Sequence, residues 1–389
     1  MIYFDAAATT LQKPASVRTA AEQAMARLAS PGRGSHAPAR EAAELVLSTR
    51  ELAAELFSCQ PEQVVFTLNA THALNLAIFS IADLGRILEK ISENFDSANV
   101  KELTLEGNPE QLTADYCRDL RALGVNRLSI GVQSFQDPVL RFMGRRHTAE
   151  EAVKAIENAV AAGFDNISID LIYGVSERGN EQWREDLQTA FRMPIKHLSC
   201  YALTPEENSI LYKQILNRRH APVDEDLASD QYDILQEMIP HSTLRQYEVS
   251  NFAVPGFESK HNYGYWHHTP YLGLGPSAHS FDGHTRHWNP SNLEQYIQNM
   301  EEGKGCEGSE TLTLEDHYNE KLLLGLRTTE GVDLRTIAID HGEERRQQLV
   351  EHFHKVVAPE LYTIEKDRLC LTAAGLWVAD GIAQSAFVV

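Results

Sequence analysis

From Ser80 to about residue 205 the chain alternates between short apolar segments and amphipathic helical segments, and this alternation limits the fold more than any other feature. Residues 102–105, 127–132, 166–173 and 197–201 read as strands, and helical periodicity separates them. Gly124 and Gly163 end two of the helices. Short strands that alternate with helices predict a parallel sheet with right-handed crossovers, either an open doubly wound sheet or part of a barrel.

Polar side chains stand at or just past the carboxyl ends of successive strands of this predicted sheet. They are Glu106, Gln133, Asp170 and Thr204. Parallel α/β proteins place their ligands at this edge. One such residue is explained as well by a loop or a helix cap, but four in the same relative position favour a binding site.

The charge balance argues against broad contact with nucleic acid or with anionic membranes. In 389 residues, 35 basic and 55 acidic side chains give a net charge of −20, and the sequence shows no basic patch. No stretch approaches the roughly 20 apolar residues of a membrane span, and the first residues lack the basic start and apolar core of a signal peptide. We therefore expect a cytoplasmic protein with no nucleic-acid partner and no membrane span.

The five cysteines are widely spaced, at positions 59, 117, 200, 306 and 370. An odd number in a chain of this length argues against a secreted disulfide framework. The closest pair is 58 residues apart, so the sequence contains no CxxxCxxC loop for zinc or an iron–sulfur cluster. Each cysteine is most simply a buried or idle thiol.

Beyond residue 205 the pattern is less regular and is rich in aromatic residues and histidine. From about residue 311 it returns to helices, and Tyr318, Leu322, Leu323 and Leu326 share one helical face before a small apolar module.

Long motifs follow one another in a fixed order from about residue 80. They are LTLEGNP (103–109), NRLSIGVQSF (126–135), GRRH (144–147), DLIYG (170–174), SCYALT (199–204), YEVSNFA (247–253), HNYGYW (261–266) and GLGPSAHS (273–280). In this order they resemble the radical S-adenosylmethionine proteins related to oxygen-independent coproporphyrinogen III oxidase, most closely the HemW heme chaperones. The sequences of the HNxxYW and GLGPSAHS motifs favour the chaperones over the oxidase, and the oxidase remains the alternative.

The resemblance implies an α/β fold: a partial parallel (β/α) barrel of the radical S-adenosylmethionine type that lacks its first strands, followed by a mostly helical C-terminal domain. It also implies that S-adenosylmethionine binds at Glu106, Gln133, Arg145, Asp170 and Ala202. The chemistry is compatible, because the ligand presents an ammonium, a carboxylate, ribose hydroxyls and a sulfonium to carboxylates, an amide and one arginine.

The family also has a CxxxCxxC loop that holds a [4Fe–4S] cluster and a GGGTP turn, and this sequence contains neither. We therefore expect no cluster in this chain and assign no catalytic residue, which leaves open whether the chain is an enzyme.

The HNxxYW motif suggests a heme contact. His261 is the leading candidate for the ligand of the heme iron, with Asn262, Tyr265 and Trp266 beside it. The alternative is that these aromatic residues pack a core. The rival histidines are His267, His268 and His279. Heme or a porphyrin, and a heme-acceptor protein, are the expected partners.

A second resemblance covers residues 1–78. The segments YFDAAATT (3–10), PGRGSH (31–36) and VFTLNATHALN (65–75) are similar to the start of a cysteine desulfurase, a class V aminotransferase-type pyridoxal-phosphate enzyme. This resemblance implies that Ala70 and Thr71, at a helix start, contact the cofactor phosphate. The family's lysine and catalytic cysteine have no counterpart here, so pyridoxal phosphate is not expected.

These resemblances predict three segments: 1–78, desulfurase-like; 80–300, truncated barrel with the heme motif; and 305–389, helical C-terminal domain. The join near residues 78–80 is explained by a gene fusion or by a sequence-joining error. The functions that remain open are a HemW-type protein defective in cluster chemistry, a coproporphyrinogen III oxidase relative, a cluster-free heme-binding module and a desulfurase fragment.

Overall fold

The computed structural model describes Glu44 and residues 81–205, 210–217 and 220–388. The chain divides into two units, residues 1–99 and 100–389. In the first, the described helix is α5 (Ile81–Asn94), which begins directly after Ser80. The segments that resemble a desulfurase, including Ala70 and Thr71, lie outside the described residues.

The second unit contains a sheet of six strands in the order β1-β2-β3-β4-β6-β5. The three neighbouring pairs from β1 to β4 are parallel, and the β4–β6 and β6–β5 pairs are antiparallel. This confirms the parallel sheet predicted from the alternation. The strands are β1 (Thr104–Gly107), β2 (Arg127–Gln133), β3 (Asn166–Tyr173), β4 (His197–Ala202), β5 (Arg245–Gln246) and β6 (Asn251–Ala253).

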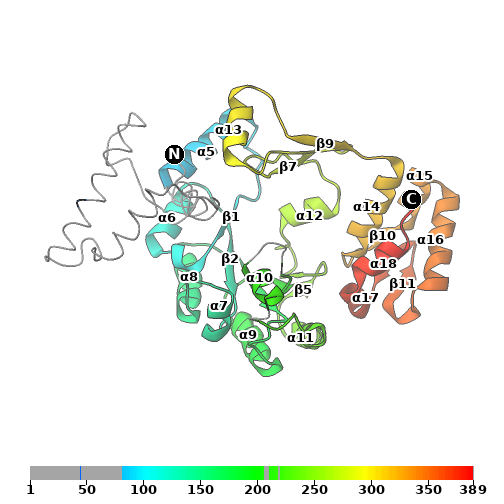
Figure 1. The fold of residues 1–389 in the computed structure, drawn as a ribbon, viewed down its shortest axis with the longest axis horizontal. Coiled ribbons are helices and arrows are strands. Elements are labelled where there is room, and N and C mark those ends of the chain that lie inside the picture. Colours follow the sequence, from blue (N-terminus) through cyan, green and yellow to red (C-terminus); the bar gives the residue numbers. More distant parts are fainter. Residues whose placement is uncertain (1–43, 45–80, 206–209, 218–219, 389) are drawn as a thin grey trace. The chain divides into compact units, whose positions relative to one another are not determined.

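Helices follow the parallel strands, and Figure 1 shows α6 to α9, in cyan to green, along the strands. Thr113 and Thr148 cap two of them, each accepting a hydrogen bond from a backbone N–H of the first turn. The apolar side chains of the strands, such as Leu128, Ile130 and Ile169, are fully buried. The helices of this region are α6 (Ala114–Ala122), α7 (Asp137–Phe142), α8 (Ala149–Ala161), α9 (Asn180–Arg192), α10 (Ile210–Leu216) and α11 (Glu225–Met238), with short 3₁₀ turns at Pro109–Gln111 and Ile239–His241.

The region that the sequence left irregular contains a second sheet. It has three antiparallel strands in the order β7-β8-β9, which the sequence analysis did not predict. Its elements are α12 (Lys260–Trp266), β7 (His279–Phe281), β8 (Thr285–Trp288), α13 (Leu293–Glu301) and β9 (Gly308–Thr311).

The C-terminal module has its own core and a small antiparallel sheet, β10-β12-β11. The predicted apolar face of its first helix is confirmed, because Tyr318, Leu322 and Leu326 are buried. Its elements are α14 (Leu314–Leu326), β10 (Val332–Asp333), α15 (Leu334–His341), α16 (Glu343–Val356), a 3₁₀ turn (Pro359–Leu361), β11 (Tyr362–Glu365), β12 (Arg368–Leu371), α17 (Ala373–Trp377) and α18 (Ala379–Ser385).

Three aromatic rings connect this module to the larger sheet. The Trp377 ring lies 5.0 Å from Tyr232 and 6.4 Å from Tyr173, measured between centroids. The Tyr232 hydroxyl donates to the Ala373 carbonyl at 3.3 Å. The end of β3, α11 and α17 therefore share one aromatic cluster.

None of the described helices combines the length and the apolarity needed to cross a bilayer.

Candidate functional site

The strands of the large sheet present polar side chains on the face opposite their buried apolar rows. In register, Glu106 pairs with Ser129, Ser129 with Ser168, and Ser168 with His197. Asp170 lies two residues further along β3, so it points to the same face as Ser168. One face of the parallel strands thus gathers the polar residues, including two predicted ligand-binding carboxylates.

Asp170 is surrounded by opposing charges. Burial raises the pKa of this carboxyl to about 6 against a hydrogen bond from Ser199, and the nearby Glu106 carboxylate raises it further. The Arg127 and Arg145 guanidiniums act in the opposite direction. One carboxylate and two arginines therefore act on the Asp170 carboxyl.

Asn108 joins Arg145 to the end of β1. The Arg145 guanidinium donates a hydrogen bond to the Asn108 side-chain oxygen at 3.3 Å. Sequence reasoning selected Arg145 but not Asn108, although both stand in the quoted motifs. An asparagine directly after a strand was the signal that was available.

Gln133 ends β2 in a strained turn. Its φ is +68°, and the Ser134 N–H donates to the Val132 carbonyl at 2.9 Å, which closes a three-residue γ-turn. The same carbonyl lies 3.0 Å from Nε2 of the buried His147. For a residue other than glycine such a conformation costs about 1–3 kcal/mol, and it persists only where the surroundings hold it.

The Gln133 amide folds back over Gly131. A Cβ at position 131 would lie 2.9 Å from Gln133 Nε2 and 3.7 Å from Asn108 Oδ1. Because Gly131 has no Cβ, the Gln133 amide can occupy this space. The Asn108 side chain, which binds Arg145, lies close to the same position. The Gln133 amide and the Asn108 side chain thus both lie close to Gly131.

The last two predicted strand-end residues lie at β4. Ala202 ends the strand and pairs in register with Tyr173, and its carbonyl accepts a weak hydrogen bond from Thr204 Oγ1 at 3.4 Å. Thr204 is exposed. Charge interactions link Asp170 to Glu106 and Arg145, and Gln133 lies near the asparagine that binds Arg145. Ala202 is related to them by strand register and offers backbone groups.

A buried hydrogen-bonded chain crosses the same face, and sequence reasoning missed it. Ser168 Oγ lies 2.8 Å from His197 Nδ1, and His197 Nε2 lies 2.9 Å from the Tyr247 hydroxyl. Burial lowers the pKa of His197 to about 3, and Arg127 contributes to the shift. The histidine is therefore neutral. A histidine at the first position of a strand was the signal that was available.

The donor set of this face fits S-adenosylmethionine. Carboxylates suit its ammonium and ribose hydroxyls, the Arg145 guanidinium suits its carboxylate, and the Gln133 amide suits either hydroxyls or the carboxylate. When bound, such a ligand supplies a sulfonium whose cleavage requires an electron from a cluster.

The described residues do not fit a [4Fe–4S] cluster. Within them, no group of three or more histidine, cysteine or acidic side chains is placed to hold a metal ion. Cys117 and Cys200 are buried on α6 and β4, and burial raises the pKa of Cys117 to about 11. Cys306 is exposed, and Cys370 belongs to β12.

The predicted heme residues lie on α12 but face two directions. The His261 and Tyr265 rings meet edge to face at 4.7 Å, and Tyr265 meets Tyr271 in the same way at 4.7 Å. Trp266 instead lines a cavity of about 630 Å³. The Asn262 N–H donates to the Ser259 hydroxyl that caps the helix. The structure therefore brings together His261 and Tyr265, and separates Trp266 from them.

The rival histidines have other partners. His267 stacks on Tyr263 at 4.1 Å and lies 3.3 Å from Glu330. His268 is half-buried, 3.8 Å from Glu320.

Two family models match the chain. The Radical SAM superfamily matches residues 45–190, and the HemN C-terminal domain matches residues 312–378. The first match begins inside the segment that resembles a cysteine desulfurase, and none of the matches supports that second resemblance.

Curated relatives and a solved structure agree with these models. The heme chaperone HemW of Bacillus subtilis is 36% identical over 248 residues, 63% of this chain and 65% of that protein. HemW of Lactococcus lactis is 32% identical, over 79% of this chain and 81% of that protein. The coproporphyrinogen III oxidase HemN of Escherichia coli has the same fold, with a TM-score of 0.68 at 21% identity over 79% of this chain and 75% of that one. The chain spans just under two thirds of the Bacillus relative and about four fifths of the Lactococcus relative. It therefore belongs to the HemW family of radical S-adenosylmethionine proteins.

Proposed function

We propose that this chain is a heme carrier of the HemW type, which binds heme at α12 and delivers it to an acceptor protein. The observation that carries the proposal is a set of exposed apolar side chains on and shortly after α12, the helix of His261. Tyr265, Leu272 and Leu274 are 39%, 59% and 62% exposed. An imidazole next to a flat apolar surface is what a heme requires, and an open surface suits a ligand that must be passed on. The relatives named heme chaperone support the same function.

A heme titration of the purified chain, followed at the Soret band, tests this proposal. We expect saturable binding, at least tenfold weaker and with a shifted band in His261→Ala. His352→Ala is the matched control, because His352 is a half-buried histidine of the C-terminal module that is bonded to Ser385. Unchanged binding in His261→Ala rejects this ligand, and no saturable binding in the parent chain rejects the heme function.

The cavity on the other side of α12 is the second candidate for the heme site. Tyr247, Tyr263 and Trp266 line it, and Arg245 and Lys260 supply cations for propionate groups. Trp266→Ala decides between the two sites: a larger loss of heme affinity in Trp266→Ala than in His261→Ala assigns the heme to the cavity.

We also propose that the strand-end site holds S-adenosylmethionine without cleaving it. The binding groups Glu106, Gln133, Arg145, Asp170 and Ala202 are present, and the cluster ligands are absent from the sequence. Anaerobic reconstitution should load no cluster. Four iron and four sulfide per chain, with 5′-deoxyadenosine formed in the presence of a reductant, would contradict this proposal.

For residues 1–78 we propose a desulfurase-like remnant that does not use pyridoxal phosphate, based on the motifs alone. A borohydride-reducible cofactor adduct on one lysine would reject it. Resequencing genomic DNA across codons 70 to 90 tests whether this segment and the barrel are encoded by one gene.

A further inference from the structure

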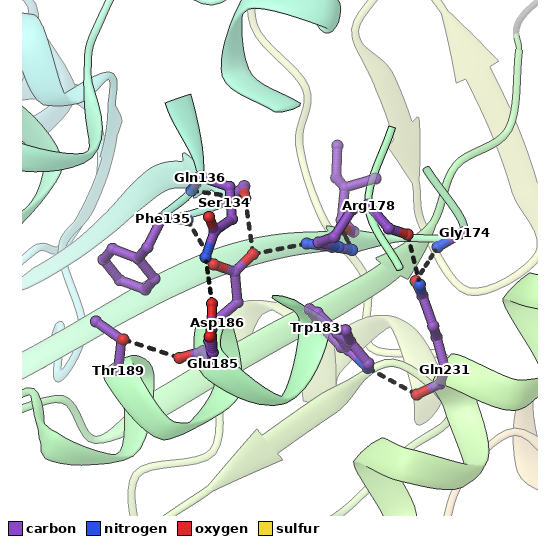
Figure 2. Close-up of polar contacts among 11 residues, drawn as sticks. Ser134, Phe135, Gln136, Gly174, Arg178, Trp183, Glu185, Asp186, Thr189 and Gln231 are labelled. Atoms are coloured by element: carbon purple, nitrogen blue, oxygen red, sulfur yellow. Dashed lines mark hydrogen bonds and ion pairs between the residues drawn. The ribbon is translucent and has the colours of Figure 1, made fainter. Parts of the chain in front are cut away.

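Two buried side chains behind the strand-end site have no part in the function proposed above. Arg178 follows β3, Asp186 is on α9, and both side chains are completely buried. Arg178 Nη1 donates to Asp186 Oδ2 at 2.7 Å. Figure 2 shows this pair between the end of β2 and the helix.

Asp186 holds the two residues that follow Gln133. Its Oδ2 accepts a hydrogen bond from Ser134 Oγ at 2.7 Å, and its Oδ1 accepts one from the Phe135 N–H at 3.0 Å (Figure 2). Ser134 is itself the donor that closes the γ-turn at Gln133. The carboxylate therefore fixes the exit from the strained turn by a side chain and by the backbone.

Arg178 extends the connection to the end of β3. Its Nη2 donates to the carbonyl of Ile172, two residues after Asp170. Its guanidinium also lies over the Trp183 ring, 4.4 Å from the centroid. One ion pair thus ties the strand end that carries Gln133 to the strand end that carries Asp170.

Gln231 of α11 closes the network on the far side. Its Oε1 accepts from the Gly174 N–H at 2.8 Å, and its Nε2 donates to the Arg178 carbonyl at 3.1 Å. The Trp183 indole donates to the Gln231 carbonyl at 2.7 Å. Gln231 therefore binds the backbone at both Gly174 and Arg178, the two ends of the loop that follows β3. These bonds fix the position of the Arg178 guanidinium (Figure 2).

A buried ion pair is a weak source of stability, because desolvation of both charges offsets their attraction. A fixed geometry is what such a pair provides best. Here the ion pair fixes the strained γ-turn at Gln133, the residue whose amide we expect to bind the ligand.

We propose that Asp186, held by Arg178, is a positioning residue that keeps the Gln133 amide in place to bind the hydroxyl or carboxylate groups of an S-adenosyl ligand. The inference rests on the proposed binding of such a ligand at the strand ends.

A double-mutant cycle with Gln133 tests it, with S-adenosylhomocysteine as the probe and isothermal calorimetry as the measurement. Asp186→Asn should weaken binding about tenfold when Gln133 is present and less than twofold in a Gln133→Ala background, because the effect passes through that amide. Equal losses in the two backgrounds would overturn the proposal. Leu349→Ala, in the C-terminal core, is the control for general destabilisation and should leave the affinity unchanged.

Two further variants keep the test decisive if Asp186→Asn folds poorly. Ser134→Ala removes the hydroxyl that donates to Asp186 and accepts from the Gln136 N–H, and it leaves the ion pair intact. It should weaken binding about threefold. Arg178→Met combined with Asp186→Leu removes both charges together, which should recover stability but not affinity. Full recovery of affinity in this variant would overturn the proposal.

Amide hydrogen exchange separates this inference from the proposed function. Absence of S-adenosylhomocysteine binding in the parent chain contradicts the proposed function. The positioning role still predicts faster exchange at Ser134 and Phe135 in Asp186→Asn than in the parent, and no such change in Leu349→Ala. Unchanged exchange at these two amides would overturn it.

Discussion

The Arg145 guanidinium and the Asn108 side-chain oxygen are joined by a hydrogen bond of 3.3 Å, although 37 residues separate them in the sequence. Through this contact the loop after β1 fixes the arginine that we expect to bind a ligand carboxylate. Lysine cannot reproduce the planar fork of the guanidinium.

Arg145→Lys should therefore weaken the binding of S-adenosylhomocysteine about tenfold, equivalent to about 1.4 kcal/mol. Methylthioadenosine, which lacks the amino-acid carboxylate, serves as the control ligand, and its affinity should not change. Calorimetry with both ligands makes the comparison. Equal losses for the two ligands would show that Arg145 does not bind the carboxylate.

Gly131→Ala should reduce the affinity for the nucleoside without reducing stability by more than about 1 kcal/mol. The new Cβ would meet Gln133 Nε2 at 2.9 Å, and that amide is the end of a flexible side chain that can move aside. The fold tolerates the movement, whereas the binding site loses the amide. Urea denaturation and calorimetry measure the two quantities, and a large loss of stability with unchanged affinity would contradict the argument.

Asp170 should make binding and stability respond to pH in opposite directions. Its pKa is raised to about 6, so the native chain holds a proton that the unfolded chain has released between about pH 4 and pH 6. Stability from this group is present at low pH and is lost as pH rises through 6. Asp170→Asn should therefore stabilise the free chain by about 1–3 kcal/mol above pH 6.

The same substitution should weaken S-adenosylhomocysteine binding, because the ionised carboxylate is no longer available to the ammonium. In the parent chain the affinity should fall as pH decreases from 7 to 5. Calorimetry across this range checks the prediction: an Asp170→Asn variant that retains the parent's pH dependence contradicts it.

His197 should contribute to acid unfolding. Its pKa is lowered from the ordinary 6.5 to about 3, so below pH 6.5 the unfolded chain takes up a proton that the native chain does not. The stability provided by the neutral imidazole is present above pH 6.5 and is lost as pH falls toward 3. His197→Gln should remove a slope of up to about 1.4 kcal/mol per pH unit. Urea denaturation between pH 4.5 and 7.5 measures it, and parallel stability curves for the two chains would reject the assignment.

The parallel core of the fold could be predicted from sequence because one signal determines it. The strand at 166–173 was predicted at its observed bounds, and those at 127 and 197 differ by one residue at the end. Apolar strands that alternate with capped amphipathic helices are compatible with few folds other than a parallel sheet. The β7-β8-β9 sheet was not predicted, since its strands are three or four residues long and carry polar residues such as Thr285, Arg286 and His287.

The site could be predicted only as far as the residues that a motif or a strand end marks. Glu106, Gln133, Arg145 and Asp170 were selected, whereas Asn108, His197 and Asp186 were not. Asp186 contacts Ser134 across 52 residues of sequence. Helical periodicity places Asp186 on the apolar face of α9 with Trp183 and Ala190, but it does not name the residue that the carboxylate binds. Long-range partners of this kind emerge only when the chain is folded.

The aromatic cluster of Tyr173, Tyr232 and Trp377 packs the sheet against the C-terminal module, so we expect the two parts to unfold together. Detaching the module would expose two tyrosine rings that are otherwise buried, one of them three residues from Asp170. The apolar area involved opposes separation of the two parts. We therefore expect a fragment that ends before Ala373 to leave both tyrosine rings without their Trp377 neighbour.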